Sequence, residues 1–250
     1  TPLLIPSFSS KGFSRPRKDG ESEISRILTW ASEFLTEAYL ISAYDVYYKY
    51  LPGPGNLPTT PSLMFLYSGG YEISTDRDYS SVIDPFPARD PWDKDRLKTV
   101  LDQWPNEIPA VFVSYDHPDE RVPFREQVAN ARKLFKKYSQ QLHLFLIKPE
   151  TKTQLTLTDV LKVACADVTE VGSFDMVGVT EKELGHCMLD RMAQVARLRT
   201  AMDEGGLQMP IHVFGALDPL SVCLYYISGA EVFDGLTWIR YAYQDGQCVY

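Results

Sequence analysis

The sequence comprises 250 residues, of which 44% are hydrophobic and 23% are charged, and its formal net charge is −8. These proportions are typical of a globular protein with one large domain or two small ones. The negative net charge argues against a general electrostatic attraction to nucleic acid, although local basic clusters lie at residues 15–18 and 132–137.

Short and nearly continuous apolar runs recur along the chain, which is the pattern of strands that are buried on both faces of a parallel sheet. They predict strands over residues 3–8, 38–43, 63–66, 110–114, 143–147, 174–179, 211–214 and 231–233. Apolar residues at helical spacing predict helices over residues 24–35, 94–104, 124–141, 158–168, 184–202 and 220–228. Asp93 and Thr158 are expected at helix starts, and Gly205 and Gly229 at helix ends.

Strands that alternate with helices indicate parallel βαβ units, and eight strands predict an α/β protein with a (β/α)8 TIM barrel. We expect this barrel to form a single domain over residues 1–250, with an open doubly wound sheet as the alternative. The least regular segments, residues 50–60 and 75–91, would follow the second and third strands at one end of the barrel. In such barrels the chemistry lies where strands end and the following loops begin.

Polar residues therefore matter most at the carboxyl ends of the predicted strands. They are Ser7, Ser9, Asp45, Tyr67, Ser68, Gly69, Gly70, Asp116, His117, Lys148, Thr180, Glu181, Asp218 and Asp234. Asp234 interrupts the last apolar run, and a carboxylate there is costly unless it is paired or used. The last strand would bring Asp234 to the functional end of the barrel.

Four segments of the sequence resemble the tRNA-guanine transglycosylase family, in the same order along the chain. SLMFLYSGGYEIS resembles the family's Asp-Ser-Gly-Gly-Phe-Gln segment, and VFVSYDHP resembles its strand that ends in Asp-Glu. MPIHVFGALDPLSVCLYYISGAEVFDGLTWIRYAY resembles its last two strands with the helix between them, and TPLLIPSFSSKG resembles its opening strand. The resemblance covers most of the 250 residues, and SGGYE and FDGL look closer to the branch that inserts 7-deazaguanine derivatives into DNA.

This resemblance implies a pentosyltransferase that exchanges a guanine-type base for a 7-deazaguanine derivative in DNA or tRNA. Asp234 matches the family's nucleophile, a carboxylate that attacks C1′ and holds the sugar covalently. Asp116 matches the carboxylate that accepts hydrogen bonds from N1–H and N2–H₂ of guanine. Ser68, Gly69 and Gly70 match a turn whose backbone approaches the base closely, which is a reason for glycine.

Other positions are carried over or depart from the family's pattern. Gly178 lies near the family's glycine-rich strand end, where backbone groups contact the purine. Tyr67 replaces the acid to which proton handling is usually assigned, and Lys148 replaces a glutamine. Base recognition at Lys148 must differ, because lysine cannot accept a hydrogen bond. We expect Tyr67, Lys148 and Arg240 to bind substrate, with Lys148 and Arg240 contributing to a positive strip.

The family's structural zinc site, a CxCxxC motif with a downstream histidine, is absent from residues 1–250. We therefore expect neither metal nor cofactor in this chain, with zinc only in a missing C-terminal segment, and we expect the chain to be a fragment. The four cysteines show no CxxC spacing, which is typical of reduced thiols in a cytoplasmic protein; they are Cys165, Cys187, Cys223 and Cys248. No apolar run approaches the length of a membrane span, so no membrane partner is expected.

Two other functions stay open at this point. One is a catalytically inactive transglycosylase-like subunit that serves nucleic-acid binding or docking, within a homo- or hetero-oligomer. The other is a TIM-barrel enzyme acting on a small sugar or phosphorylated substrate, although its glycine-rich phosphate loop is missing. Structural roles are also open: Asp234 bonded to a backbone turn, Asp116 as a cap, Tyr67 in core packing, and Lys148 facing solvent.

Overall fold

The computed structural model describes residues 1–11, 13, 22–57, 59–75 and 90–249, without the side chains of residues 240, 243 and 248. Eight parallel strands form a closed barrel in the order of the sequence. They are β1 (Leu3–Phe8), β2 (Ala38–Ser42), β3 (Leu63–Tyr67), β4 (Ala110–Val113), β5 (Leu142–Leu146), β6 (Met176–Thr180), β7 (Ile211–Phe214) and β8 (Val232–Gly235). The predicted (β/α)8 TIM barrel is confirmed, and the alternative of an open sheet is wrong.

The chain divides into two compact units. Unit 1 comprises Thr1–Pro6, Asp119–Lys137 and His143–Tyr250, and unit 2 comprises Ser7–Pro118 and Tyr138–Leu142. The described helices of unit 1 are α5 (Phe124–Phe135), α6 (Thr158–Ala166), α7 (Val168–Val171), η2 (Glu181–Glu183), α8 (Met188–Glu204), α9 (Pro219–Ile227) and α10 (Thr237–Arg240). Those of unit 2 are α1 (Glu23–Ala31), α2 (Ala43–Tyr47), η1 (Pro54–Asn56), α3 (Gly70–Ile73) and α4 (Lys94–Asp102).

The strands of unit 2 are apolar because both of their faces are covered. Every residue of β2 and of β4 is buried. Aromatic side chains fill the space around them, with Phe8 edge-on to Tyr39 at 5.7 Å between ring centroids and Trp104 edge-on to Phe112 at 5.8 Å. This burial explains why these strands read as continuous apolar runs and not as alternating ones.

In unit 1, Arg199 of α8 binds the amino ends of β7 and β8. Its guanidinium donates to the main-chain oxygens of Leu207 at 2.6 Å and Met209 at 3.1 Å, and it lies 3.6 Å from a Glu231 carboxylate oxygen. Gly229, with φ of +104°, brings the backbone against Arg199, since a Cβ there would lie 2.4 Å from Arg199 Cγ. These contacts stabilise the end of the strands opposite to the one where TIM barrels carry their chemistry.

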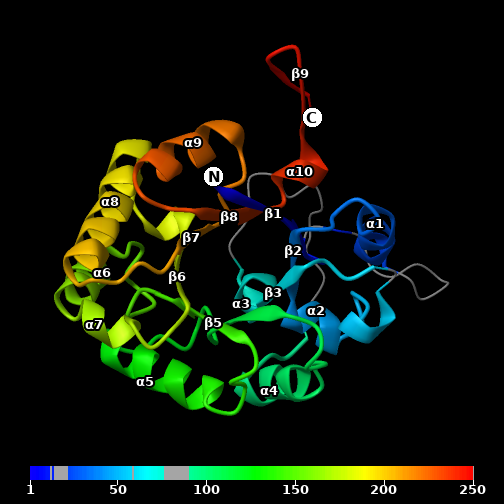
Figure 1. Ribbon diagram of the computed structural model, residues 1–250, viewed down its shortest axis with the longest axis horizontal. Coiled ribbons are helices and arrows are strands. Elements are labelled where there is room, and N and C mark those ends of the chain that lie inside the picture. The colour runs from blue at the N-terminus through cyan, green and yellow to red at the C-terminus, as the bar shows by residue number, and fades with distance from the viewer. Residues whose placement is uncertain (12, 14–21, 58, 76–89, 250) are drawn as a thin grey trace. The chain divides into compact units, whose positions relative to one another are not determined.

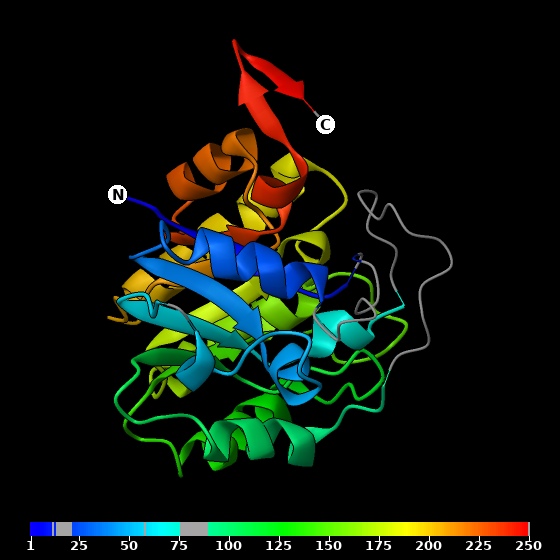
Figure 2. The same cartoon turned by 90° about the vertical axis from the view of Figure 1, so that its right-hand side faces the viewer.

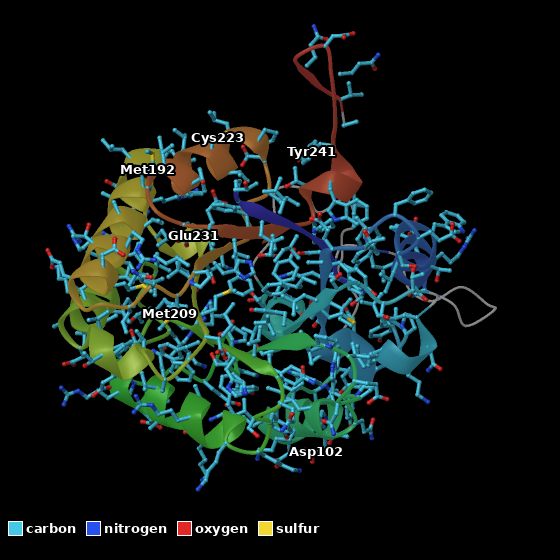
Figure 3. The ribbon with its side chains drawn as sticks, viewed as in Figure 1. Asp102, Met192, Met209, Cys223, Glu231 and Tyr241 are labelled. Carbon is cyan, nitrogen blue, oxygen red and sulfur yellow. The ribbon has the colours of Figure 1, made fainter. Side chains whose placement is uncertain are left out.

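The helix predicted over residues 124–141 is too long, because α5 ends at Phe135. The residues that follow it are bound within unit 2 by side-chain hydrogen bonds. The Tyr138 hydroxyl donates to Asp102 Oδ1 at 2.6 Å (Asp102 is labelled in Figure 3), and Ala110 N donates to Gln141 Oε1 at 2.7 Å. Tertiary contacts therefore override the helical spacing of these residues.

Two predicted helix starts are also corrected, and α1 and α4 end at Ala31 and Asp102, before the predicted 35 and 104. α8 begins at Met188 and not at 184, because Gly185 has a φ of +155° that no helix contains. Leu157 precedes α6 as its N-cap, so the capping role predicted for Thr158 is wrong. Asp93 does cap α4, accepting from the main-chain N–H of Asp95 and Arg96. Gly205 and Gly229 follow α8 and α9 as predicted.

The last described strands form a separate ribbon. β9 (Ala242–Gln244) and β10 (Gln247–Val249) pair in antiparallel fashion and extend away from α10 in both views (Figures 1 and 2). Within the described ranges, no helix has the length and apolar character that crossing a membrane requires.

Candidate active site

In unit 2, the predicted base-binding residues lie together at the carboxyl ends of β3 and β4. Tyr67 is the last residue of β3, and its hydroxyl donates to Asp116 Oδ2 at 2.9 Å. The main-chain N–H of Asp116 donates to Ser68 Oγ at 3.1 Å, and both residues are buried. The side chain of Asp116 is thus hydrogen-bonded to Tyr67 of β3, and its main chain to Ser68, which follows β3.

Two glycines permit this arrangement. Gly69 has a φ of +99°, which favours glycine, and a Cβ there would lie 2.5 Å from Nε1 of Trp92. That indole N–H donates to the main-chain oxygen of Ser68 at 2.8 Å. A Cβ on Gly70 would lie 2.6 Å from the main-chain oxygen of Asp116 and 2.7 Å from its Oδ2. The close approach that requires glycine at position 70 is therefore to Asp116.

Two further carboxylates are buried beside this turn. Glu72 of α3 accepts from Ser9 Oγ at 2.6 Å and from Ser42 Oγ at 2.7 Å. Asp45 of α2 accepts from the main-chain N–H of Ser10 at 2.8 Å and from the Ser10 hydroxyl. The loop after β1 is thus bound by acids that follow β2 and β3.

The surroundings of these acids raise their pKa values. Burial raises the pKa of Asp45 well above its usual range, and the nearby negative charge of Glu72 raises it further, against the hydrogen bonds from Ser10. Burial also raises the pKa of Glu72, although the bonds from Ser9 and Ser42 and the Lys11 ammonium oppose this shift. Both acids therefore hold their protons to a higher pH than exposed carboxyls do.

In unit 1, Asp234 lies in β8 and is paired with Ile5 of β1 in the sheet. Its Oδ1 lies 3.0 Å from Nε2 of His212 and accepts from the main-chain N–H of Gly215 at 3.3 Å. His212 is fully buried in β7, and Asp234 is 6% exposed. The hydrogen bond from the main chain of Gly215 is the contact that a purely structural aspartate would make. The contact with the His212 side chain is an additional one.

Gly178 supports the same group of residues through packing. It pairs with His212 in the sheet, and a Cβ there would lie 2.6 Å from the Phe214 ring and 2.7 Å from Leu144 Cδ2. The Phe214 ring stacks on the His212 imidazole at 3.8 Å between centroids. Glycine at position 178 thus makes room for the ring that covers His212, and a contact of Gly178 with a purine stays a prediction.

Lys148 follows β5 and is buried, so the alternative of a solvent-facing residue is wrong. Its Nζ lies 2.7 Å from Glu183 Oε2 and donates to Thr180 Oγ1 at 3.1 Å. Arg121 NH2 lies 3.7 Å from the other Glu183 oxygen. Lys148 is thus paired with Glu183, and a contribution of its ammonium to a positive strip stays a prediction.

Several predicted contributors lie outside the described residues. They are the side chain of Arg240, the basic cluster at 15–18 and most of the loop at 75–91. Among the residues that the structure does describe, no group of three or more His, Cys, Asp or Glu side chains could hold a metal ion. Zinc in a missing C-terminal segment stays a prediction.

Three residues near the predicted ones were not predicted from the sequence: Lys11 donates to the main chain of α3, Glu72 accepts from Ser9 and Ser42, and His212 contacts Asp234. His212 stands inside a four-residue apolar strand, and Glu72 follows the Ser-Gly-Gly turn directly. A polar residue in a buried run is costly unless it is paired. The signal that singled out Asp234 was therefore also present at His212.

A scan of the sequence against models of known protein families finds no match, and a search of curated proteins finds none either. The resemblance to the tRNA-guanine transglycosylases stays a prediction from the sequence. The geometry around Asp116 and Asp234 is what bears on function.

Proposed function

We propose that this protein is a base-exchange transglycosylase that acts on DNA or tRNA and replaces a guanine-type base by a 7-deazaguanine derivative. Asp234 is the nucleophile, and Asp116 is the carboxylate that selects the base. The observation that carries the proposal is the environment of Asp234, a buried carboxylate at the end of the last barrel strand with Oδ1 held by His212 and Gly215.

The chemistry of the exchange suits a carboxylate in this position. Asp234 attacks C1′, a bond forms between its oxygen and the sugar, and the bond from C1′ to the base breaks. The departing base keeps the electron pair of that bond and takes up a proton, and the incoming base loses a proton when it displaces Asp234. The exchange therefore needs no net acid, and the covalent intermediate divides one difficult displacement into two.

His212 and Gly215 are positioning residues in this proposal. With the tautomer protonated at Nε2, His212 donates a hydrogen bond to Asp234 Oδ1. The stacked Phe214 ring fixes the plane of the imidazole. Two fixed donors on one oxygen restrict the rotation of the carboxylate before substrate arrives, which lowers the entropic cost of reaching the attacking geometry.

Asp116 is suited to select a base with adjacent N–H donors. An ionised carboxylate only accepts hydrogen bonds, so it matches N1–H and N2–H₂ of guanine and rejects bases that present acceptors there. The Tyr67 hydroxyl and the Ser68 side chain hold Asp116 in one orientation. The proposal therefore assigns selection of the base to Asp116 and the side chains of unit 2 that hold it.

The test is the variant Asp234→Asn, which keeps the size of the side chain and removes its charge. Exchange of labelled guanine into DNA and tRNA should fall by about 10⁴-fold or more, and the protein–nucleic acid adduct on a denaturing gel should disappear, while binding survives. Asp159→Asn is the matched control, because Asp159 lies on the first turn of α6 and pairs with Lys162 at the surface.

An Asp234→Asn protein that exchanges base as fast as the parent would show that the nucleophile is assigned wrongly. If the parent binds nucleic acid and exchanges no base on any polymer, the inactive-subunit function replaces the proposal. If it binds neither nucleic acid nor guanine, the small-substrate enzyme becomes the better account.

A further inference from the structure

The side chain of Glu72, in the helix that follows β3, contacts residues at the carboxyl ends of β1 and β2. Ser9, which follows β1, donates to one carboxylate oxygen, and Ser42, which ends β2, donates to the other. Glu72 itself lies in α3, two residues after Gly70, and is 4% exposed. Each oxygen therefore ties α3 to a different neighbouring strand.

Lys11 makes a second attachment to the same helix. Its Nζ donates to the main-chain oxygens of Tyr71 at 2.9 Å and Ser74 at 3.1 Å, and it lies 4.2 Å from the centroid of the Tyr71 ring. These carbonyls are at the C-terminal end of α3, where a positive charge is favourable. The loop after β1 thus holds both the middle and the end of this four-residue helix.

The first residue of α3 is the glycine that contacts Asp116. Because a Cβ on Gly70 would lie 2.6 Å from the main-chain oxygen of Asp116, there is no room for a side chain between the start of the helix and the aspartate. Ser68, two residues earlier, accepts from the main chain of Asp116. A shift of α3 by a few tenths of an ångström must therefore change the orientation of Asp116.

We infer that Glu72 is a positioning residue for base selection: by bridging Ser9 and Ser42 it fixes the Ser68–Gly70 turn, and through the turn it fixes Asp116. This inference rests on the proposed function, in which Asp116 reads the base. It assigns to Glu72 no contact with the substrate. It also gives the site a dependence on pH, because the bridge changes when the carboxyl gains a proton.

The charged and titratable groups around the bridge set the sign of that dependence. Lys11 faces Glu72 from the loop after β1, Asp45 faces it from α2, and Tyr44 and Tyr50 face Asp45. Burial raises the pKa of Glu72, so the protonated form persists to a higher pH than in an exposed glutamate. An ionised Glu72 accepts from both serines, whereas a protonated one must donate one of its bonds.

Trp92 reports the position of the turn, since its indole N–H donates to Ser68 O and its ring touches Gly69. The protein is labelled with 5-fluorotryptophan, and its four tryptophan signals are assigned by Trp→Phe variants and followed by ¹⁹F NMR against pH. In the parent, the Trp92 signal should move with a midpoint above the usual range of a glutamic acid. In Glu72→Gln, which keeps the shape of the side chain, this movement should vanish.

Kinetics separate positioning from a merely structural role. In Glu72→Ala, KM for guanine should rise about tenfold, as expected for one lost hydrogen bond to a charged group, with kcat changed by less than about threefold. Glu33→Gln is the matched control in the same unit, because Glu33 is exposed after α1, and it should leave KM and the Trp92 signal unchanged.

A Trp92 signal that titrates identically in the parent and in Glu72→Gln would overturn the inference, as would an unchanged KM in Glu72→Ala. If Glu72→Ala does not fold, the Gln variant and its pH titration decide the question alone. If the parent exchanges no base, the proposed function fails, and the Trp92 titration still accepts or rejects Glu72 as the residue that positions the turn.

Discussion

Gly70→Ala tests the geometry around Asp116 with a single methyl group. The new Cβ would lie 2.6 Å from the Asp116 main-chain oxygen, whereas real Cβ contacts essentially never come within 3.0 Å. The two groups must therefore separate by at least 0.4 Å, the difference between these distances. A backbone oxygen cannot turn away as the end of a flexible side chain can, so the strain falls on the turn and on β4.

The expected cost follows from packing. Overpacking a close contact by one methyl typically costs about 1–3 kcal/mol of stability. The φ of Gly70 is not left-handed, so the backbone itself tolerates alanine, and the better helix propensity of alanine offsets at most about 1 kcal/mol in this short helix. We therefore expect a net loss of about 1–2 kcal/mol in the free energy of unfolding, together with weaker binding of guanine, because Oδ2 of Asp116 is displaced as well.

Urea unfolding measures the loss, and Gly53→Ala is the matched control. Gly53 lies in the same unit with φ of −66°, and no atom lies within 4 Å of the place that an alanine methyl would take, so alanine there should stabilise by about 0.4–1 kcal/mol. Equal stability of Gly70→Ala and the parent, with equal binding of guanine, would refute the close approach of Gly70 to Asp116. Equal losses in both glycine variants would refute a cost specific to Gly70.

Two further predictions concern buried charges. Burial and the charge of Glu72 raise the pKa of Asp45, so the folded chain keeps a proton that the unfolded chain loses near pH 4. The free energy of unfolding should therefore decline as the pH rises from about 4 toward the raised pKa. Urea midpoints measured against pH should show this decline, and Asp45→Asn should flatten it. A parent whose midpoint rises over this interval would contradict the assignment. Lys148→Met should lower the free energy of unfolding by about 3–5 kcal/mol, measured by thermal and urea unfolding, because it leaves Glu183 buried without its nearest cation. The double variant Lys148→Met/Glu183→Met should recover part of this loss. A double variant less stable than Lys148→Met would contradict the ion pair.

The sequence predicted the barrel because its strands are buried on both faces. Continuous apolar runs mark such strands clearly, and β1 and β7 begin and end where the pattern says. The boundaries that failed depend on contacts distant in sequence. Residues 138–141 have helical spacing, yet Tyr138 and Gln141 bind Asp102 and Ala110, more than 30 residues away. Periodicity within a segment contains no information about such partners.

For the candidate site, too, the sequence predicted which residues lie at the strand ends but not the residues that bind them. The order of polar residues at strand ends located Tyr67, Ser68 and Asp116 together, because the carboxyl ends of neighbouring parallel strands meet. The partners of these residues were not predictable from order. The two serines that Glu72 binds lie 63 and 30 positions earlier, so no local pattern around Glu72 indicates them.

Both departures from the family's pattern are accompanied by a partner on another element, and this supports specific roles for them. An acid at position 67 would bring a second carboxylate to hydrogen-bond distance of Asp116 Oδ2, where like charges repel. Tyrosine supplies a neutral donor there instead, so Asp116 can be oriented without a competing charge. Lysine at position 148 likewise comes with Glu183, which accepts from it and balances its charge. A buried polar group persists only when its hydrogen bonds are made. The pairs Tyr67–Asp116 and Lys148–Glu183 are therefore the units to exchange when the two departures are tested, because replacing either partner alone leaves the other buried without its contact.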